Sequence, residues 1–87
     1  MLRTRNLTLT STAQQLTIDD AMDSPNTISV QNTDSSAVLY IGNASVTSSN
    51  YGIKLSSGQI WSADLAADDK IYAVGAGTTV AVMILER

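Results

Sequence analysis

Three short, dense apolar runs separated by turn-forming residues constrain the fold of this chain most strongly. They cover residues 37–41, 60–65 and 71–74, and Gly, Ser, Asn, Thr and Asp make up much of the sequence between them. Runs of this length that are rich in Val, Ile, Tyr and Trp and bounded by turn formers are typical of β-strands. The pattern in the central part of the chain therefore predicts β-strands.

Alternation of apolar and polar residues predicts further strands on both sides of this stretch. Residues 3–10 place Leu7 and Leu9 on one face, and residues 26–32 alternate in the same way. Shorter strands are expected at residues 14–18, 37–41, 53–55, 59–65, 70–74 and 78–85. Residues 75–77 (Gly-Ala-Gly) are interpreted as a hairpin connection, because Gly tolerates positive φ. About eight short strands without a convincing helix predict an all-β fold, a small antiparallel β-sandwich or jelly roll.

The N-terminal segment has two interpretations. Residues 1–12 form either an arm or the first strand, and residues 13–87 form the sandwich domain. Arg3 and Arg5 continue the inward-facing series of this segment but are charged, which favours an arm or an edge strand. Because an extended segment at a chain end can add a strand to the open sheet edge of another protein, we expect this segment to bind a partner.

The last predicted strand is apolar on both faces. One face would carry Val80, Val82 and Ile84, and the other would carry Ala81, Met83 and Leu85. Antiparallel sheets in monomers usually keep one face polar, so the second apolar face needs a cover from the same chain or from another subunit. We favour a subunit interface, because a domain of 87 residues has a marginal core and no Cys for disulfides.

The composition argues against several classes of function. The chain has no His and no Cys, so the commonest general base, the thiolate nucleophile and thiolate or imidazole metal ligands are missing. Ser56 or Ser57 with Lys54 or Lys70 is an alternative catalytic pair, but no Ser-x-x-Lys or nucleophile-elbow context surrounds them. We therefore predict no enzymatic activity, no catalytic residues and no cofactor.

Charge and hydropathy bear on the partners. A net charge of −3 and a pI near 4.4 argue against nucleic acid, which favours clustered Lys and Arg. No run approaches the roughly 20 apolar residues of a membrane helix, and the N-terminus lacks the apolar core of a signal peptide. We expect no membrane partner and synthesis in a cytoplasm.

Two acidic clusters are candidate Ca²⁺ sites. They consist of Asp19, Asp20 and Asp23, and of Asp64, Asp68 and Asp69. Neither shows the spaced Asp-x-Asp-x-Asp-Gly pattern, and Asp is common in turns, so we interpret both as turns and expect no metal site. Asn6 and Asn43 open glycosylation acceptor triplets, which we interpret as chance matches in a chain without a secretory signal.

The four aromatic side chains could stack on a sugar. They are Tyr40, Tyr51, Trp61 and Tyr72. Trp61 lies among Ile60, Ala63 and Leu65, which favours packing in the core or at a seam. Tyr51 lies in a polar loop and is the best candidate for an exposed contact, to protein or to sugar.

The central and C-terminal sequence resembles small virion proteins of tailed bacteriophages over roughly residues 26–87. The matching parts are residues 36–42 (SAVLYIG), 46–47 with Asn50 and Gly52, Leu55 with Gly58, 62–65 (SADL), 69–74 (DKIYAV), and 77–80 (GTTV) with Val82 and 85–86. The pattern is one of turns and strands and contains no catalytic signature. The resemblance implies a non-enzymatic β-sandwich that commonly trimerises, as a capsid decoration (cement) protein, a head-fibre component or a tail module.

From this resemblance we expect a capsid decoration protein on the outer surface of the virion. It would be a homotrimer that binds the major capsid protein and stabilises contacts between neighbouring capsid subunits. Its capsid-binding residues would be Leu2, Arg3, Arg5, Leu7 and Leu9, and its subunit interface would be the last strand. The alternative is a carbohydrate-binding or adaptor module of a phage tail or head spike.

Overall fold

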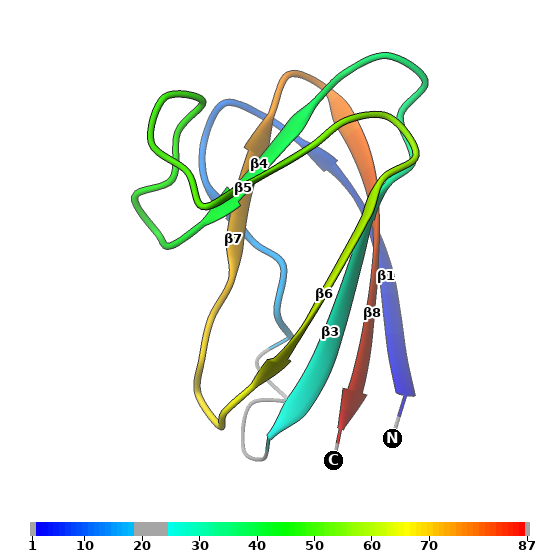
Figure 1. Ribbon diagram of the computed structural model, residues 1–87, viewed down its shortest axis with the longest axis vertical. Helices are drawn as coiled ribbons and strands as arrows, with labels where there is room; N and C mark the ends of the chain where they lie inside the picture. The colour runs from blue at the N-terminus through cyan, green and yellow to red at the C-terminus, as the bar shows by residue number, and fades with distance from the viewer. Residues whose placement is uncertain (1, 19–24, 87) are drawn as a thin grey trace.

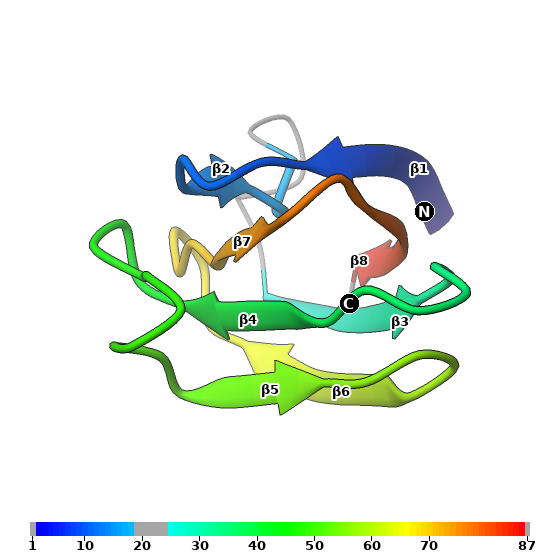
Figure 2. The same ribbon diagram turned by 90° about the horizontal axis from the view of Figure 1, so that it is seen from above.

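The computed structural model describes residues 2–18 and 25–86, and within them the chain forms two antiparallel sheets of four strands each (Figure 1). The strands are β1 (Leu2–Leu9), β2 (Gln14–Gln15), β3 (Asn26–Asn32), β4 (Leu39–Gly42), β5 (Ile53–Leu55), β6 (Ile60–Leu65), β7 (Tyr72–Gly75) and β8 (Thr78–Glu86). The first sheet has the order β1-β8-β3-β6, and the second has the order β2-β7-β4-β5. Figure 2 shows the two sheets as facing layers.

The connections confirm the predicted β-sandwich of jelly-roll type. Apart from the β4–β5 pair, strands that follow one another in the described sequence belong to different sheets. Strands of one sheet are therefore joined by long-range pairs, such as Leu2 opposite Leu85 and Asn26 opposite Glu86. In this arrangement the chain packs two sheets face to face.

Two sequence predictions about local structure need correction. Residues 75–77 do not form a hairpin, because β7 pairs with β4 in the second sheet whereas β8 pairs with β1 and β3 in the first. Gly77 does have positive φ (69°), and its N–H donates to the Leu9 carbonyl at 2.9 Å. The expected strand at 14–18 is ladder-paired only at Gln14 and Gln15, after which the Leu16 N–H donates to the Ile71 carbonyl.

The core lies between the sheets and follows the period-2 alternation of the strands. On β3, Ile28 and Val30 are buried while Thr27 and Ser29 face outward. The buried hydrophobic cluster consists of Leu9, Leu16, Ile28, Val30, Leu39, Ile41, Leu55, Leu65, Ala73, Val80, Val82 and Ile84. Trp61 is half-buried and packs against this cluster, in agreement with its predicted place in the core.

One buried polar side chain ties the two sheets together. Asn32, at the end of β3, is fully buried, and its Nδ2 donates to the carbonyls of Ala37 (2.8 Å) and Leu55 (3.0 Å). Its Oδ1 accepts from the Asp34 N–H at 2.9 Å. Since Leu55 belongs to β5, this amide links a strand of the first sheet to a strand of the second.

Candidate functional site

The outer face of the first sheet is centred on β8, whose apolar residues point in two directions. Inward are Val80, Val82 and Ile84, and outward are Ala81, Met83 and Leu85, which we call the outer row. The inward three are at most 2% exposed, whereas Met83 and Leu85 are 44% and 48% exposed. This corrects the assignment of Val80, Val82 and Ile84 to a subunit interface, because the second sheet of the same chain covers them. The interface role of the outer row stays a prediction.

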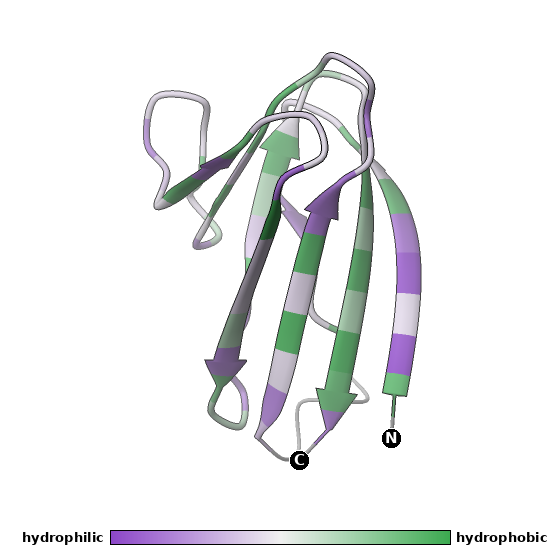
Figure 3. Ribbon diagram, turned by 45° about the vertical axis from the view of Figure 1, so that its right-hand side comes forward, coloured by the Kyte–Doolittle hydropathy of each residue, from purple (hydrophilic) through white to green (hydrophobic). Residues whose placement is uncertain are grey.

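Neighbouring strands extend the outer row into a face of low charge. Leu2 of β1 lies opposite Leu85 and is 56% exposed, so the apolar row widens at this end of the sheet. Figure 3 shows β8 as hydrophobic along most of its length, between β3, where hydrophobic residues alternate with more polar ones, and the more hydrophilic β1. The outward polar residues of β1, β3 and β6 are Thr4, Asn6, Thr8, Thr27, Ser29, Gln31, Ser62 and Asp64, of which Asp64 alone is charged.

A hollow of about 440 Å³ lies in this face. Ile60 of β6, at 63% exposed the most open large hydrophobic residue described, lies at its rim opposite Gln31. The hollow is lined by Thr4, Asn6, Ser29, Gln31, Ile60, Ala81, Val82 and Met83. None of these lining residues carries a charge, and depletion of charge is the compositional mark of the centre of a protein–protein interface.

The predicted capsid-binding residues do not share one surface, because residues 2–9 are an ordinary strand paired with β8 along its whole length. Leu2 faces outward, whereas Arg3, Arg5, Leu7 and Leu9 form the inward row of β1. Leu9 is fully buried in the core, so its assignment to a capsid contact is corrected. Leu7 is half-buried and packs against the core, and this leaves Leu2 and the two arginines as the accessible part of the prediction.

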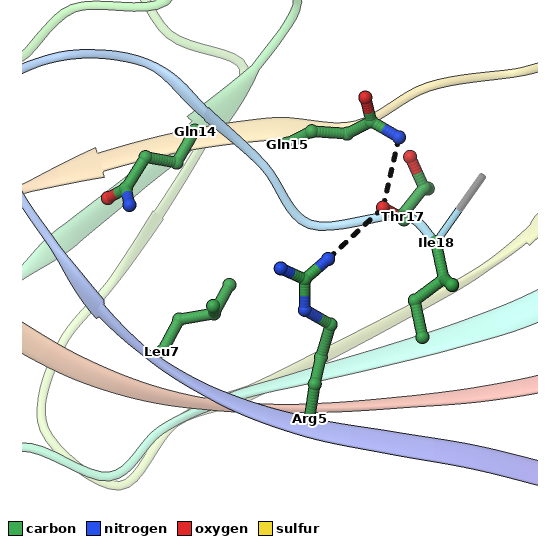
Figure 4. A pocket seen from close by; sticks show the side chains of 6 residues that line it. All are labelled: Arg5, Leu7, Gln14, Gln15, Thr17 and Ile18. Carbon is green, nitrogen blue, oxygen red and sulfur yellow. Dashed lines mark hydrogen bonds between the residues drawn. The ribbon is translucent and has the colours of Figure 1, made fainter.

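The two arginines have different surroundings. Arg3 Nε donates to Glu86 Oε1 at 2.8 Å, which forms an ion pair between β1 and β8. Arg5 Nη1 donates to the Thr17 carbonyl at 3.4 Å, its one hydrogen bond within residues 2–18 and 25–86. Arg5 and Leu7 extend from β1 towards the segment that contains β2 (Figure 4).

Between β1 and the segment that contains β2 lies a pocket of about 380 Å³, at the edge of the sandwich. It is lined by Arg5, Leu7, Gln14, Gln15, Thr17 and Ile18. Sequence reasoning singled out Arg5 but missed the contribution of residues 14–18. The one signal in the sequence was the charge of Arg5, which shares an inward-facing row of β1 with apolar residues and so indicates a polar or open surrounding.

The aromatic candidate Tyr51 is 45% exposed, and its ring packs against Tyr40 with centroids 4.7 Å apart and planes inclined at 48°. It borders a small pocket of about 280 Å³ with Asn43 and Asn50. Trp61 contributes nothing to this surface, because it lies in β6 of the other sheet and packs against the core.

The carboxylates shape turns. Asp34 accepts from the N–H groups of Ala37 (2.7 Å) and Ser36 (3.1 Å) and from Thr79. These hydrogen bonds, that from Ala37 first, hold the pKa of Asp34 below its ordinary value of 3.8. Asp69 likewise accepts from the Ala66 N–H at 3.1 Å. Nothing in the local sequence distinguishes Asp34 from other turn aspartates.

The other acidic and nucleophilic candidates stand apart from one another. In residues 2–18 and 25–86 no group of three or more acidic side chains is arranged to hold a metal ion, and Asp19, Asp20 and Asp23 lie outside these residues. The Ser57 hydroxyl donates to the Asp34 carbonyl at 2.6 Å, and it is not hydrogen-bonded to a lysine. No helix long and apolar enough to cross a membrane occurs in the described part of the chain.

Comparison with known proteins gives a similarity at the level of the fold. No family model matches the chain, and no curated protein matches it. A solved structure from the endospore appendages of Bacillus, reported as disulfide-linked pili, is similar with a TM-score of 0.58 and 14% sequence identity. The match covers 97% of this chain and 82% of that one. This chain is therefore similar in fold to a structural protein of a pilus, although it has no cysteine of its own.

Proposed function

We propose that this chain is a structural protein of a tailed-bacteriophage virion, a decoration protein that binds the outer capsid surface and stabilises contacts between major capsid subunits. The observation that carries the proposal is the outer face of the first sheet. There Leu2 lies opposite Leu85, and Met83 continues the same row of β8 beside the neutral side chains of Thr4, Thr27 and Ser29. The phage setting comes from the sequence resemblance described above.

The energetics of this face favour a protein contact. Fully burying a Leu or Met side chain contributes about 1.5–3 kcal/mol. With roughly half of each of Leu2, Met83 and Leu85 still exposed, covering them would add about 1 kcal/mol per residue. Such a contribution is modest for one residue, but it adds up over the contacts between neighbouring copies, and linked copies bind a shell more tightly than single ones.

The proposed assembly is a homotrimer without catalytic function. Neighbouring copies would meet through the outer row, Ala81, Met83 and Leu85, while the free edge of β1 faces the major capsid protein with Leu2, Arg3 and Arg5. An edge strand offers unpaired backbone groups to a partner, and β1 is eight residues long. The missing His and Cys agree with a non-enzymatic role. The fold is also compatible with such a role, since it occurs in a pilus.

The test measures mass and capsid binding together. At 9.2 kDa per chain, a trimer has three times that mass, and native mass spectrometry or sedimentation should detect it. We expect Met83→Glu to yield monomers that bind empty capsids at least about tenfold more weakly, since a buried unpaired carboxylate costs several kcal/mol. Lys54→Glu, an exposed change on the second sheet, is the control and should leave both properties unchanged. The proposal would be refuted if the protein stays monomeric at high concentration and also fails to bind capsids from which it is absent.

A second candidate function, a carbohydrate-binding module of a tail or head spike, is favoured by Tyr51. Its exposed ring lies beside Asn43 and Asn50, and an aromatic ring with nearby amides is a combination that can stack on and hydrogen-bond a sugar. A glycan array that gives binding lost in Tyr51→Ala would support this function. An array without binding would leave the decoration role as the better account.

A further inference from the structure

The pocket between β1 and β2 contains an arginine, Arg5, for which the described residues supply no counterion. Arg5 is half-buried in the inward row of β1, and no carboxylate of the described residues pairs with it. Its hydrogen bond to the Thr17 carbonyl, at 3.4 Å, is longer than the usual 2.7–3.2 Å. The same carbonyl already accepts from Gln15 Nε2 at 3.0 Å. The guanidinium has five N–H donors, and this one long contact engages it weakly.

Arg3 provides an internal comparison. It lies two residues away in the same row of the same strand, and it has its carboxylate, Glu86, at 2.8 Å. Partial burial removes water from a charge, and an opposite charge compensates for that loss. Arg3 is compensated within the chain, whereas Arg5 faces a pocket of about 380 Å³.

The other walls of the pocket define the chemistry of a ligand. Leu7 and Ile18 are half-buried apolar side chains that can contact methylene groups (Figure 4). Gln14 also lines the pocket, and its Oε1 accepts from the Thr10 N–H at 3.1 Å, which fixes the amide and leaves its Nε2 as a further donor. A single guanidinium with apolar walls suits a monoanion on an aliphatic stem better than a phosphate, which favours several cations or backbone donors.

We propose that this pocket binds the carboxylate of a glutamate side chain, with the Arg5 guanidinium as the charged donor and Leu7 and Ile18 against the methylene stem. A planar guanidinium and a carboxylate match in bidentate geometry. The assignment of this glutamate to a major capsid subunit rests on the proposed function. The binding of a glutamate carboxylate at Arg5 does not depend on it.

The site can be tested by nuclear magnetic resonance on the ¹⁵N-labelled whole chain. The probes are the acetylated and amidated tripeptide Ala-Glu-Ala, its Ala-Gln-Ala counterpart, and acetylated Ala-Ala-Ala with a free carboxyl end. We expect the Glu peptide to shift the Arg5 Nε–H resonance saturably, with a Kd on the order of 1–10 mM for one charge-assisted contact. The Gln peptide should bind at least about tenfold more weakly.

Matched variants assign the effect to Arg5. Arg5→Gln should lose about tenfold or more in affinity for the Glu peptide, Arg5→Lys should keep part of it, and Arg3→Gln should stay within about twofold of the unchanged chain. An unfolding curve for each variant confirms that it is folded. Equal shifts with the Glu and Gln peptides, or unchanged affinity in Arg5→Gln, would overturn the proposal. A response only to the free carboxyl end would overturn the assignment to glutamate.

The same variants separate this inference from the proposed function. If Arg5→Gln binds empty capsids as well as the unchanged chain does, the pocket has no part in capsid binding while the decoration role stands. If the chain binds the Glu peptide through Arg5 but never binds capsids, the site stands and the decoration role fails.

Discussion

Replacement of Asn32 by Ala tests how the two sheets are held together. The substitution removes three hydrogen bonds from a fully buried side chain: two to the carbonyls of Ala37 and Leu55, and one from the Asp34 N–H. Each such bond contributes about 1 kcal/mol net, and each buried group left unpaired costs about 1–3 kcal/mol. We therefore expect the free energy of unfolding to fall by about 3–5 kcal/mol, out of the roughly 4–13 kcal/mol expected for a chain of this length.

Urea and thermal unfolding measure this loss. At about 4–8 °C per kcal/mol for a domain of this size, the midpoint temperature should fall by at least about 12 °C. The control is Gln31→Ala on the same strand, whose side chain points to the outer face and should cost no more than about 0.5 kcal/mol. If Asn32→Ala lowers stability no more than Gln31→Ala does, the buried amide does not tie the sheets together and the reasoning is refuted.

Two further predictions concern Asp34 and the two faces of β8. Because hydrogen bonds from Ala37 and other N–H groups lower the pKa of Asp34, its stabilising contribution is complete above the ordinary value of 3.8 and is lost as pH falls through the lower folded-state pKa. The stability advantage of the unchanged chain over Asp34→Asn should therefore shrink between pH 7 and pH 2 in urea titrations, and a constant difference would contradict it. On β8, Ile84→Ala should cost about 2–5 kcal/mol, whereas Leu85→Ala should cost under about 1 kcal/mol in dilute solution, where association is absent. Equal losses in chemical unfolding would contradict the assignment of these two residues to opposite faces.

The strand pattern could be predicted because a strand's alternation is local. Residues 26–32 and 53–55 are predicted as strands and have those bounds in the structure, since apolar and polar side chains alternate within them and turn formers flank them. Ile84 and Leu85 were likewise expected on opposite faces. Which face belongs to the core was not predictable, because both are apolar and only the position of the second sheet distinguishes them.

The contacts at the candidate sites depend on residues far apart in the sequence. Arg5 lines a pocket with residues 14–18 because β1 and β2 are the corresponding edges of the two sheets, and nothing near Arg5 in the sequence indicates this. Asn32 reads as a turn residue, and its importance comes from carbonyls at positions 37 and 55. The sequence Gly-Ala-Gly predicts a hairpin, but the same residue types also suit a turn that crosses from one sheet to the other, which is what the structure contains.

By itself, the sequence determined the class of fold, the approximate strand positions and the alternation of side chains between the two faces of each strand, since period-2 alternation and turn chemistry act over a few residues. Only the tertiary structure decided the strand order, the burial of Leu9, Val80, Val82 and Ile84 within one chain, and the open pocket beside Arg5. Backbone pairing is indifferent to side-chain identity, so the partner of each strand is chosen by how the whole set of apolar faces can be covered at once.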